Sequence, residues 1–158
     1  MKKETEKIKS FLDSLGLKER IVELPQSAHT AQEAANALGC QIAQIAKSIV
    51  FKASQDQPVL VIASGSNRID EKKIEQLAGQ TIGKADADFV LAKTGFAIGG
   101  VPPAGHSEKL QTFVDEDLAK FTEIWAAAGT SRTVFRLTYP ELLEITQGRV
   151  INIKTGED

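Results

Sequence analysis

Two apolar runs, IAKSIVF at residues 45–51 and VLVIA at residues 59–63, decide the fold. Both runs are rich in β-branched side chains, and the polar segment SQDQP at residues 54–58 separates them. Runs of this length and composition with a turn between them are typical of core strands joined as a hairpin. The sequence therefore predicts a β-hairpin in the core.

Helical patterns lie on both sides of this hairpin. Apolar residues recur with helical spacing over 3–17, and Gly16 stands where a helix would stop. Thr30 to Glu33 forms a capping-box pattern before an Ala-rich helix that ends at Gly39. Further helices are predicted from Asp70 to Leu77, over about 86–93 and over 140–146.

Further strands are expected over 20–24, 110–114, 124–128, 133–137 and 150–153. Strands and helices are mixed without a strict βαβ alternation, and no repeat or linker divides the chain. The pattern favours a single α+β or mixed α/β domain that spans residues 1–158.

Composition narrows the function classes. One cysteine, Cys40, and two histidines exclude a disulfide framework and a cysteine-based zinc site, so we expect no metal and no cofactor. The charged start has no apolar core of a signal peptide, and no apolar run is long enough to cross a membrane, so we expect a cytoplasmic protein. The net charge of −2 argues against DNA binding by bulk electrostatics. It still allows a few residues to bind one nucleotide at the end of an RNA strand.

Lys47 is the first candidate for chemistry. In a strand over 45–51 it would share a face with Ile45, Ile49 and Phe51. A cation on an apolar strand face is costly unless it is paired or meets an anionic ligand. The alternative is that the lysine stem covers the core and its ammonium group reaches water.

The second candidate is the loop GFAIGGVPPAG at residues 95–105, which contains four glycines and two prolines. Such a loop could direct the amides of Gly99 and Gly100 at a substrate oxygen, as an oxyanion hole does. It is not a phosphate-binding Walker loop, because no Gly-Lys-Ser or Gly-Lys-Thr follows. The alternative is a tight structural turn.

Other polar residues give weaker signals. His29 lies at a helix start, where a solvated loop position is the simpler interpretation, and no role follows for His106. Cys40 is expected to be a packed or idle thiol. The segment 67–70 is either a helix cap with a surface arginine or a phosphate contact, and the cap is favoured.

The ordered motifs Glu33-Ala34-Ala35, Gln44-Ile45-Ala46-Lys47-Ser48, Gly99-Gly100-Val101-Pro102-Pro103 and Ala127-Ala128-Gly129-Thr130 resemble the YbaK/prolyl-tRNA synthetase editing-domain family. The resemblance runs from about residue 21 to residue 153. It implies a mixed, barrel-like β-sheet surrounded by helices, and a free-standing hydrolase that deacylates mischarged aminoacyl-tRNA. The expected substrate is tRNA for proline carrying alanine, cysteine, serine or 2-aminobutyrate.

The resemblance also implies the site residues. It places the functional groups at Lys47, Gly99 and Gly100, and the substrate-binding residues at Ile49, Val101, Pro102, Pro103, Gly129 and Thr130. Some relatives have a histidine near the last segment, where this sequence has Gly129, Thr130 and Ser131. The expected partner is the terminal adenosine end of aminoacyl-tRNA, and prolyl-tRNA synthetase is a further candidate.

No side chain is an obvious nucleophile or general base. We therefore expect attack by water, assisted by the neighbouring ribose hydroxyl of the substrate, with no covalent enzyme intermediate. Two alternatives stay open at this point. One is a non-catalytic module that binds aminoacyl-tRNA or a synthetase, and the other is a small-molecule esterase without an RNA role.

Overall fold

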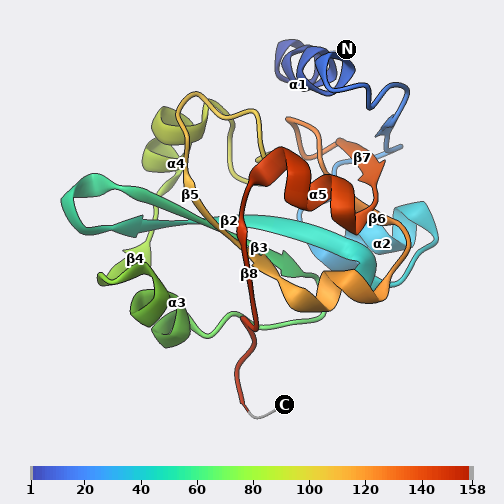
Figure 1. The fold of residues 1–158 in the computed structure, drawn as a ribbon. Coiled ribbons are helices and arrows are strands. Elements are labelled where there is room, and N and C mark those ends of the chain that lie inside the picture. The colour runs from blue at the N-terminus through green and yellow to red at the C-terminus, as the bar shows by residue number, and fades with distance from the viewer. Residues whose placement is uncertain (1, 157–158) are drawn as a thin grey trace.

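The predicted hairpin forms the centre of the computed structural model, which describes residues 2–156 (Figure 1). Strands β2 (Ile45–Ala53) and β3 (Pro58–Ser64) pair antiparallel, with Ala46 opposite Ser64 and Lys52 opposite Pro58. The short 3₁₀ turn η2 (Ser54–Asp56) joins them. Every residue of β3 is buried, which explains its unbroken apolar sequence.

Eight strands form one mixed sheet in the order β1-β7-β6-β2-β3-β5-β8, with β4 attached to β2. The remaining strands are β1 (Ile21–Glu23), β4 (Ile82–Lys84), β5 (Gln111–Asp115), β6 (Ile124–Ala127), β7 (Thr133–Leu137) and β8 (Arg149–Ile151). The pairs β2–β6, β3–β5 and β5–β8 are parallel, and the other pairs are antiparallel. The predicted mixed α/β fold is confirmed, although the sheet does not close within the described residues because β1 and β8 remain its two ends.

Five α-helices surround this sheet (Figure 1). They are α1 (Lys3–Ser14), α2 (Ala31–Leu38), α3 (Glu71–Ala78), α4 (Ala87–Thr94) and α5 (Tyr139–Thr146), with 3₁₀ turns η1 (Ile42–Gln44) and η3 (Glu116–Lys120). Their ends follow local signals: the side chains of Thr30, Asp70 and Asp86 accept hydrogen bonds from the first turns of α2, α3 and α4. Gly39 and Gly79 end α2 and α3 in the left-handed conformation.

The two faces of β2 contact different parts of the core. Ala46 and Val50 belong to the main core, which also contains α1, β5, β6 and β7 residues. Phe51 and the half-buried Ile49 contact a second cluster around Ile74 of α3. This division follows from the alternation of side chains along a strand.

Pairing along one edge of β2 is interrupted. On the side away from β3, β6 pairs with Ile45 and Ala46, and β4 pairs with Phe51 to Ala53. Within residues 2–156, no strand pairs with the intervening residues 47–50 on that side. The sheet therefore has a gap beside Lys47 and Ser48.

Strand β4 is an element that the sequence did not predict. It has three residues, one of them Gly83, and such a segment has too few side chains for a strand pattern. Its conformation depends on its partner β2. In the described part of the chain, no helix is long and apolar enough to cross a membrane.

Candidate active site

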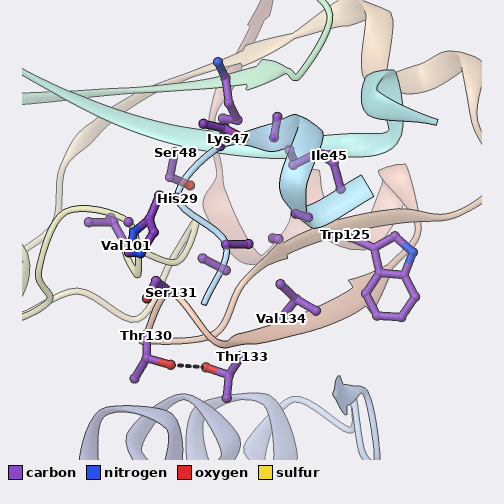
Figure 2. Close-up of a pocket in the computed structure, with 18 of the residues that line it drawn as sticks. His29, Ile45, Lys47, Ser48, Val101, Trp125, Thr130, Ser131, Thr133 and Val134 are labelled. Carbon is purple, nitrogen blue, oxygen red and sulfur yellow. Dashed lines mark hydrogen bonds between the residues drawn. The ribbon is translucent and has the colours of Figure 1, made fainter. Parts of the chain in front are cut away.

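A cavity of about 350 Å³ opens at the gap beside β2 (Figure 2). Its walls come from four segments: residues 28–34 at the start of α2, residues 45–49 of β2, the 98–101 loop, and residues 125–134 of β6, β7 and the turn between them. The sheet order β7-β6-β2 brings the strand residues together. Hydrogen bonds from Ala28 N–H to the Ser131 carbonyl and from Gly129 N–H to the Gly100 carbonyl join the other two segments to the β6–β7 turn. Most of the wall is apolar, which is typical of a small-ligand site.

The structure brings five of the predicted site residues to this cavity. They are Lys47, Ile49, Gly99, Val101 and Thr130. The other four, Gly100, Pro102, Pro103 and Gly129, do not line it. The predicted loop therefore contributes to the cavity wall only through Ile98, Gly99 and Val101 among its described residues.

Gly99 and Gly100 have different roles in the loop. Gly100 N–H donates to the Ala97 carbonyl at 3.0 Å, which closes a turn whose third residue is Gly99, with a φ of +94°. A turn of this type favours glycine at that position. Gly99 N–H has no acceptor among the described residues, whereas Gly100 N–H is already engaged. Of these two glycines, Gly99 therefore offers a free amide for a substrate oxygen, and Gly100 does not in this conformation.

Gly100 is needed for close packing. A Cβ built on it would lie 2.6 Å from the Gly129 carbonyl oxygen and 2.6 Å from Thr130 Cα. Gly129 N–H in turn donates to the Gly100 carbonyl at 3.0 Å. These contacts fix the 98–101 loop against the β6–β7 turn and so set the width of the cavity.

The two prolines are buried behind the cavity wall. The Pro102 carbonyl lies 2.7 Å from Nε2 of His106, which must donate because a carbonyl oxygen only accepts. Burial lowers the pKa of His106, so the neutral ring that makes this hydrogen bond is favoured. His106, whose role was not apparent from the sequence, therefore stabilises the loop that carries Gly99 and Val101.

Lys47 lies at the edge of the cavity and not in its depth. Figure 2 shows Lys47 and Ser48 leaving β2 on opposite sides, with Ser48 on the cavity side. Lys47 is half-buried and also lines an open groove on the other face, next to Asn67 and Arg68. Within residues 2–156, its ammonium group has no ion pair or hydrogen bond. It is therefore available to an anionic group that passes over the edge of β2.

A chain of hydroxyl groups supports the far wall. Thr130 Oγ1 lies 2.9 Å from Thr133 Oγ1, and Thr133 Oγ1 lies 2.9 Å from Thr5 Oγ1 of α1 (Figure 2 draws the first pair). Thr5 and Thr133 are buried. A Cβ on Gly129 would lie 2.8 Å from the backbone of Glu4, so this helix also closes on the turn.

Sequence reasoning missed several wall residues, chiefly His29, Ser48, Trp125, Ser131 and Val134. His29 is exposed at the cavity mouth, which agrees with the solvated position expected for it. Trp125 and Val134 carried no signal, because only the strand order brings them to β2. Ser48 did carry a signal, since its hydroxyl group lies between the apolar residues Ala46 and Val50 on one face of the predicted strand.

The described residues that line the cavity include no Asp or Glu, whereas they do include Lys47. Such a site favours a ligand that brings an anionic group to the edge and neutral groups to the interior. An ester linked to a phosphodiester has this distribution of charge.

Comparisons with known proteins point to one family. The profile of the aminoacyl-tRNA editing domain matches residues 25–145. The uncharacterized protein YwhH of Bacillus subtilis is 33% identical over 130 residues, which cover 82% of this chain and 83% of YwhH. EbsC of Enterococcus faecalis, a proposed Cys-tRNA(Pro)/Cys-tRNA(Cys) deacylase, is 26% identical over 129 residues, which cover 81% and 79% of the two chains.

A solved structure agrees with these sequence matches. The crystal structure of a proposed trans-editing enzyme for prolyl tRNA synthetase has a TM-score of 0.92 to this chain, with 41% identity and 99% coverage of both chains. The predicted enzyme class, an aminoacyl-tRNA deacylase, is confirmed together with the family. By its profile, its relatives and its fold, this chain belongs to the aminoacyl-tRNA editing domain family.

Proposed function

We propose that this protein hydrolyses mischarged tRNA for proline in trans, and that it removes small amino acids such as alanine, cysteine, serine or 2-aminobutyrate. Two similar proteins support the choice of tRNA: EbsC is named for Cys-tRNA(Pro), and the related crystal structure is named for prolyl tRNA synthetase. The observation that carries the proposal is the cavity, whose rigid apolar wall meets a free Gly99 amide. The reaction would take place in the cytoplasm, with prolyl-tRNA synthetase as a partner.

Each part of the site has a task in this proposal. The aminoacyl ester enters the cavity, and Lys47 binds the phosphate that links the terminal ribose to the preceding nucleotide. Water attacks the ester carbonyl, assisted by the neighbouring ribose hydroxyl of the substrate. The Gly99 N–H donates to the developing oxyanion, and such donors act on the transition state more strongly than on the bound ester.

Selectivity would come from exclusion by size. One methylene group changes binding in an apolar pocket by only about 1–3 kcal/mol, so attraction alone cannot separate proline from alanine. Val101 is buried and held in place by the packed loop behind it, and Ile49 lies on the neighbouring strand. Both can form a wall that rejects the proline ring, while Pro103 stiffens the loop from behind.

The test is a panel of one tRNA charged with alanine, cysteine, serine, 2-aminobutyrate or proline. With substrate in large excess over protein, we expect repeated turnover of the small amino acids and intact prolyl-tRNA. Prolyl-tRNA hydrolysed at the same rate would contradict the size sieve and indicate a general deacylase. Val101→Ala should widen the range of substrates toward proline, and Val22→Ala, an exposed valine outside the cavity, should not.

A further inference from the structure

The hydroxyl group of Ser48 is buried and has no hydrogen-bond partner. Among the described residues that are not exposed, its Oγ is the one side-chain nitrogen or oxygen atom in this condition. Other buried hydroxyl groups have partners: Ser64 Oγ donates to the Ala43 carbonyl at 2.7 Å, and Thr94 Oγ1 donates to the Val90 carbonyl at 2.7 Å. A buried hydroxyl without a partner destabilises a fold, so its presence suggests that a ligand supplies the partner.

Ser48 lies at the boundary between the main core and the cavity. Its neighbours on the same face of β2, Ala46 and Val50, are 2% and 8% exposed and pack in the core. Ser48 itself faces the side of the cavity formed by the loop of Val101 (Figure 2). A second cavity, of about 290 Å³, lies beside the first, and Ser48, Gly99 and Val101 line both. Ser48 and Gly99 therefore both lie where the two cavities adjoin.

The chemistry of the cavity limits what this hydroxyl can bind. The wall has no carboxylate among its described residues, so a substrate ammonium group would lie in its depth without a counter-charge. A neutral oxygen that gains negative charge during the reaction fits better, because a hydroxyl group can donate to it. One donor is already available at Gly99, and Gly100 cannot be the second while its N–H bonds to Ala97.

We propose that Ser48 is a catalytic residue whose Oγ–H is the second hydrogen-bond donor to the oxyanion, beside Gly99 N–H. This proposal rests on the deacylase function proposed above. When the oxygen of water bonds to the ester carbon, the carbonyl π electrons move to the carbonyl oxygen, which Ser48 and Gly99 then hold. The bond from carbon to the ribose oxygen breaks next, and that oxygen takes the proton that water loses. Ser48 keeps its own proton throughout.

Ser48 does not have the surroundings of a nucleophile. A nucleophilic serine needs a base within hydrogen-bonding distance, and within the described residues no side chain contacts its Oγ in this way. No acyl-enzyme should therefore form on Ser48.

The test compares two serines that are matched in residue type but differ in hydrogen bonding. Ser48→Ala removes a hydroxyl that has no partner, so thermal stability should stay the same or rise, while kcat for a small aminoacyl-tRNA falls by about 100- to 1000-fold. Ser64→Ala removes a hydroxyl bonded to the Ala43 carbonyl in the 3₁₀ turn η1, so Tm should fall while kcat stays within about threefold. KM should change little in both variants, and Ser48→Thr, which restores a hydroxyl, should recover part of kcat.

The outcomes separate this proposal from the proposed function. A Ser48→Ala protein that turns over within threefold of wild type would overturn the role of Ser48 and leave the deacylase function intact. A covalent aminoacyl-enzyme trapped on Ser48 would also overturn it, in favour of a nucleophile. A folded wild-type protein that is inert toward every charged tRNA for proline would overturn the proposed function, and the role of Ser48 with it.

Discussion

The ion pair of Arg20 and Glu141 gives a stability prediction that can be worked out in detail. Arg20 donates to both carboxylate oxygens of Glu141, at 2.9 and 3.0 Å, and so ties the start of β1 to the first turn of α5. The Glu141 carboxylate also accepts from Thr138 N–H at 2.8 Å. The two side chains are only 20% and 24% exposed. The arginine hydrogen bonds are the main reason that the pKa of Glu141 falls from 4.5 to about 2.

The size and sign of the effect follow from this pKa. The difference between 4.5 and 2 is 2.5 pH units, and at about 1.4 kcal/mol per unit it corresponds to about 3 kcal/mol of unfolding free energy. Because the folded pKa lies below the unfolded value, the stabilisation is complete above pH 4.5 and is lost as the pH falls toward 2. At pH 3 about 1.4 kcal/mol of it should remain by the same relation.

The measurement is urea unfolding of wild type and Glu141→Gln at pH 7 and pH 3. The variant should be less stable by about 3 kcal/mol at pH 7 and by less than half of that at pH 3. Asp13→Asn is the control, because the Lys9–Asp13 pair at 2.8 Å is exposed and should contribute little to stability at either pH. A Glu141→Gln deficit of equal size at both pH values would refute the electrostatic argument.

Two further predictions concern the site. Lys47→Ala should lower the initial rate of deacylation at least about tenfold without unfolding the protein. Lys52, whose ammonium group pairs with Asp56 on the surface, is the control, and Lys52→Ala should leave the rate unchanged. A normal rate in Lys47→Ala would show that Lys47 is not part of the site. Gly100→Ala should lower the unfolding free energy by roughly 1–3 kcal/mol because its Cβ would meet backbone at 2.6 Å. Gly83→Ala, which meets nothing within 4 Å, should be nearly neutral, and equal stabilities of the two glycine variants would contradict this packing argument.

Local signals explain why most of the fold could be predicted. The caps at Thr30, Asp70 and Asp86 and the hairpin of β2 and β3 depend on neighbouring residues, and the structure has them where the sequence indicates. Strand β4 escaped prediction because its three residues are extended only through pairing with β2. The closure of the sheet was also beyond sequence patterns, because it depends on which strands become its ends.

The site was predictable in part for a similar reason. The sequence motifs indicated Lys47 and the glycine loop, and residue types alone could suggest that an amide there binds an oxygen. The residue types could not show that the Gly100 N–H donates to the Ala97 carbonyl while the Gly99 N–H stays free. The direction of each amide depends on the backbone conformation of the turn. Nor could they show that Ser48 faces a cavity and not the core, since the gap between β6 and β4 arises only in the folded sheet.

Helix α1 has a consequence for transplanting this domain. The family profile begins at residue 25, yet α1 supplies Thr5 to the hydroxyl chain that ends at Thr130, and its Glu4 backbone closes on Gly129. A fusion protein built from residues 25–145 would keep the 98–101 loop but would lose the helix that packs behind the β6–β7 turn. A host protein must therefore supply a helix at this place, with a hydroxyl group facing Thr133. Without it, the β6–β7 turn would move away from the cavity that should hold the amino acid.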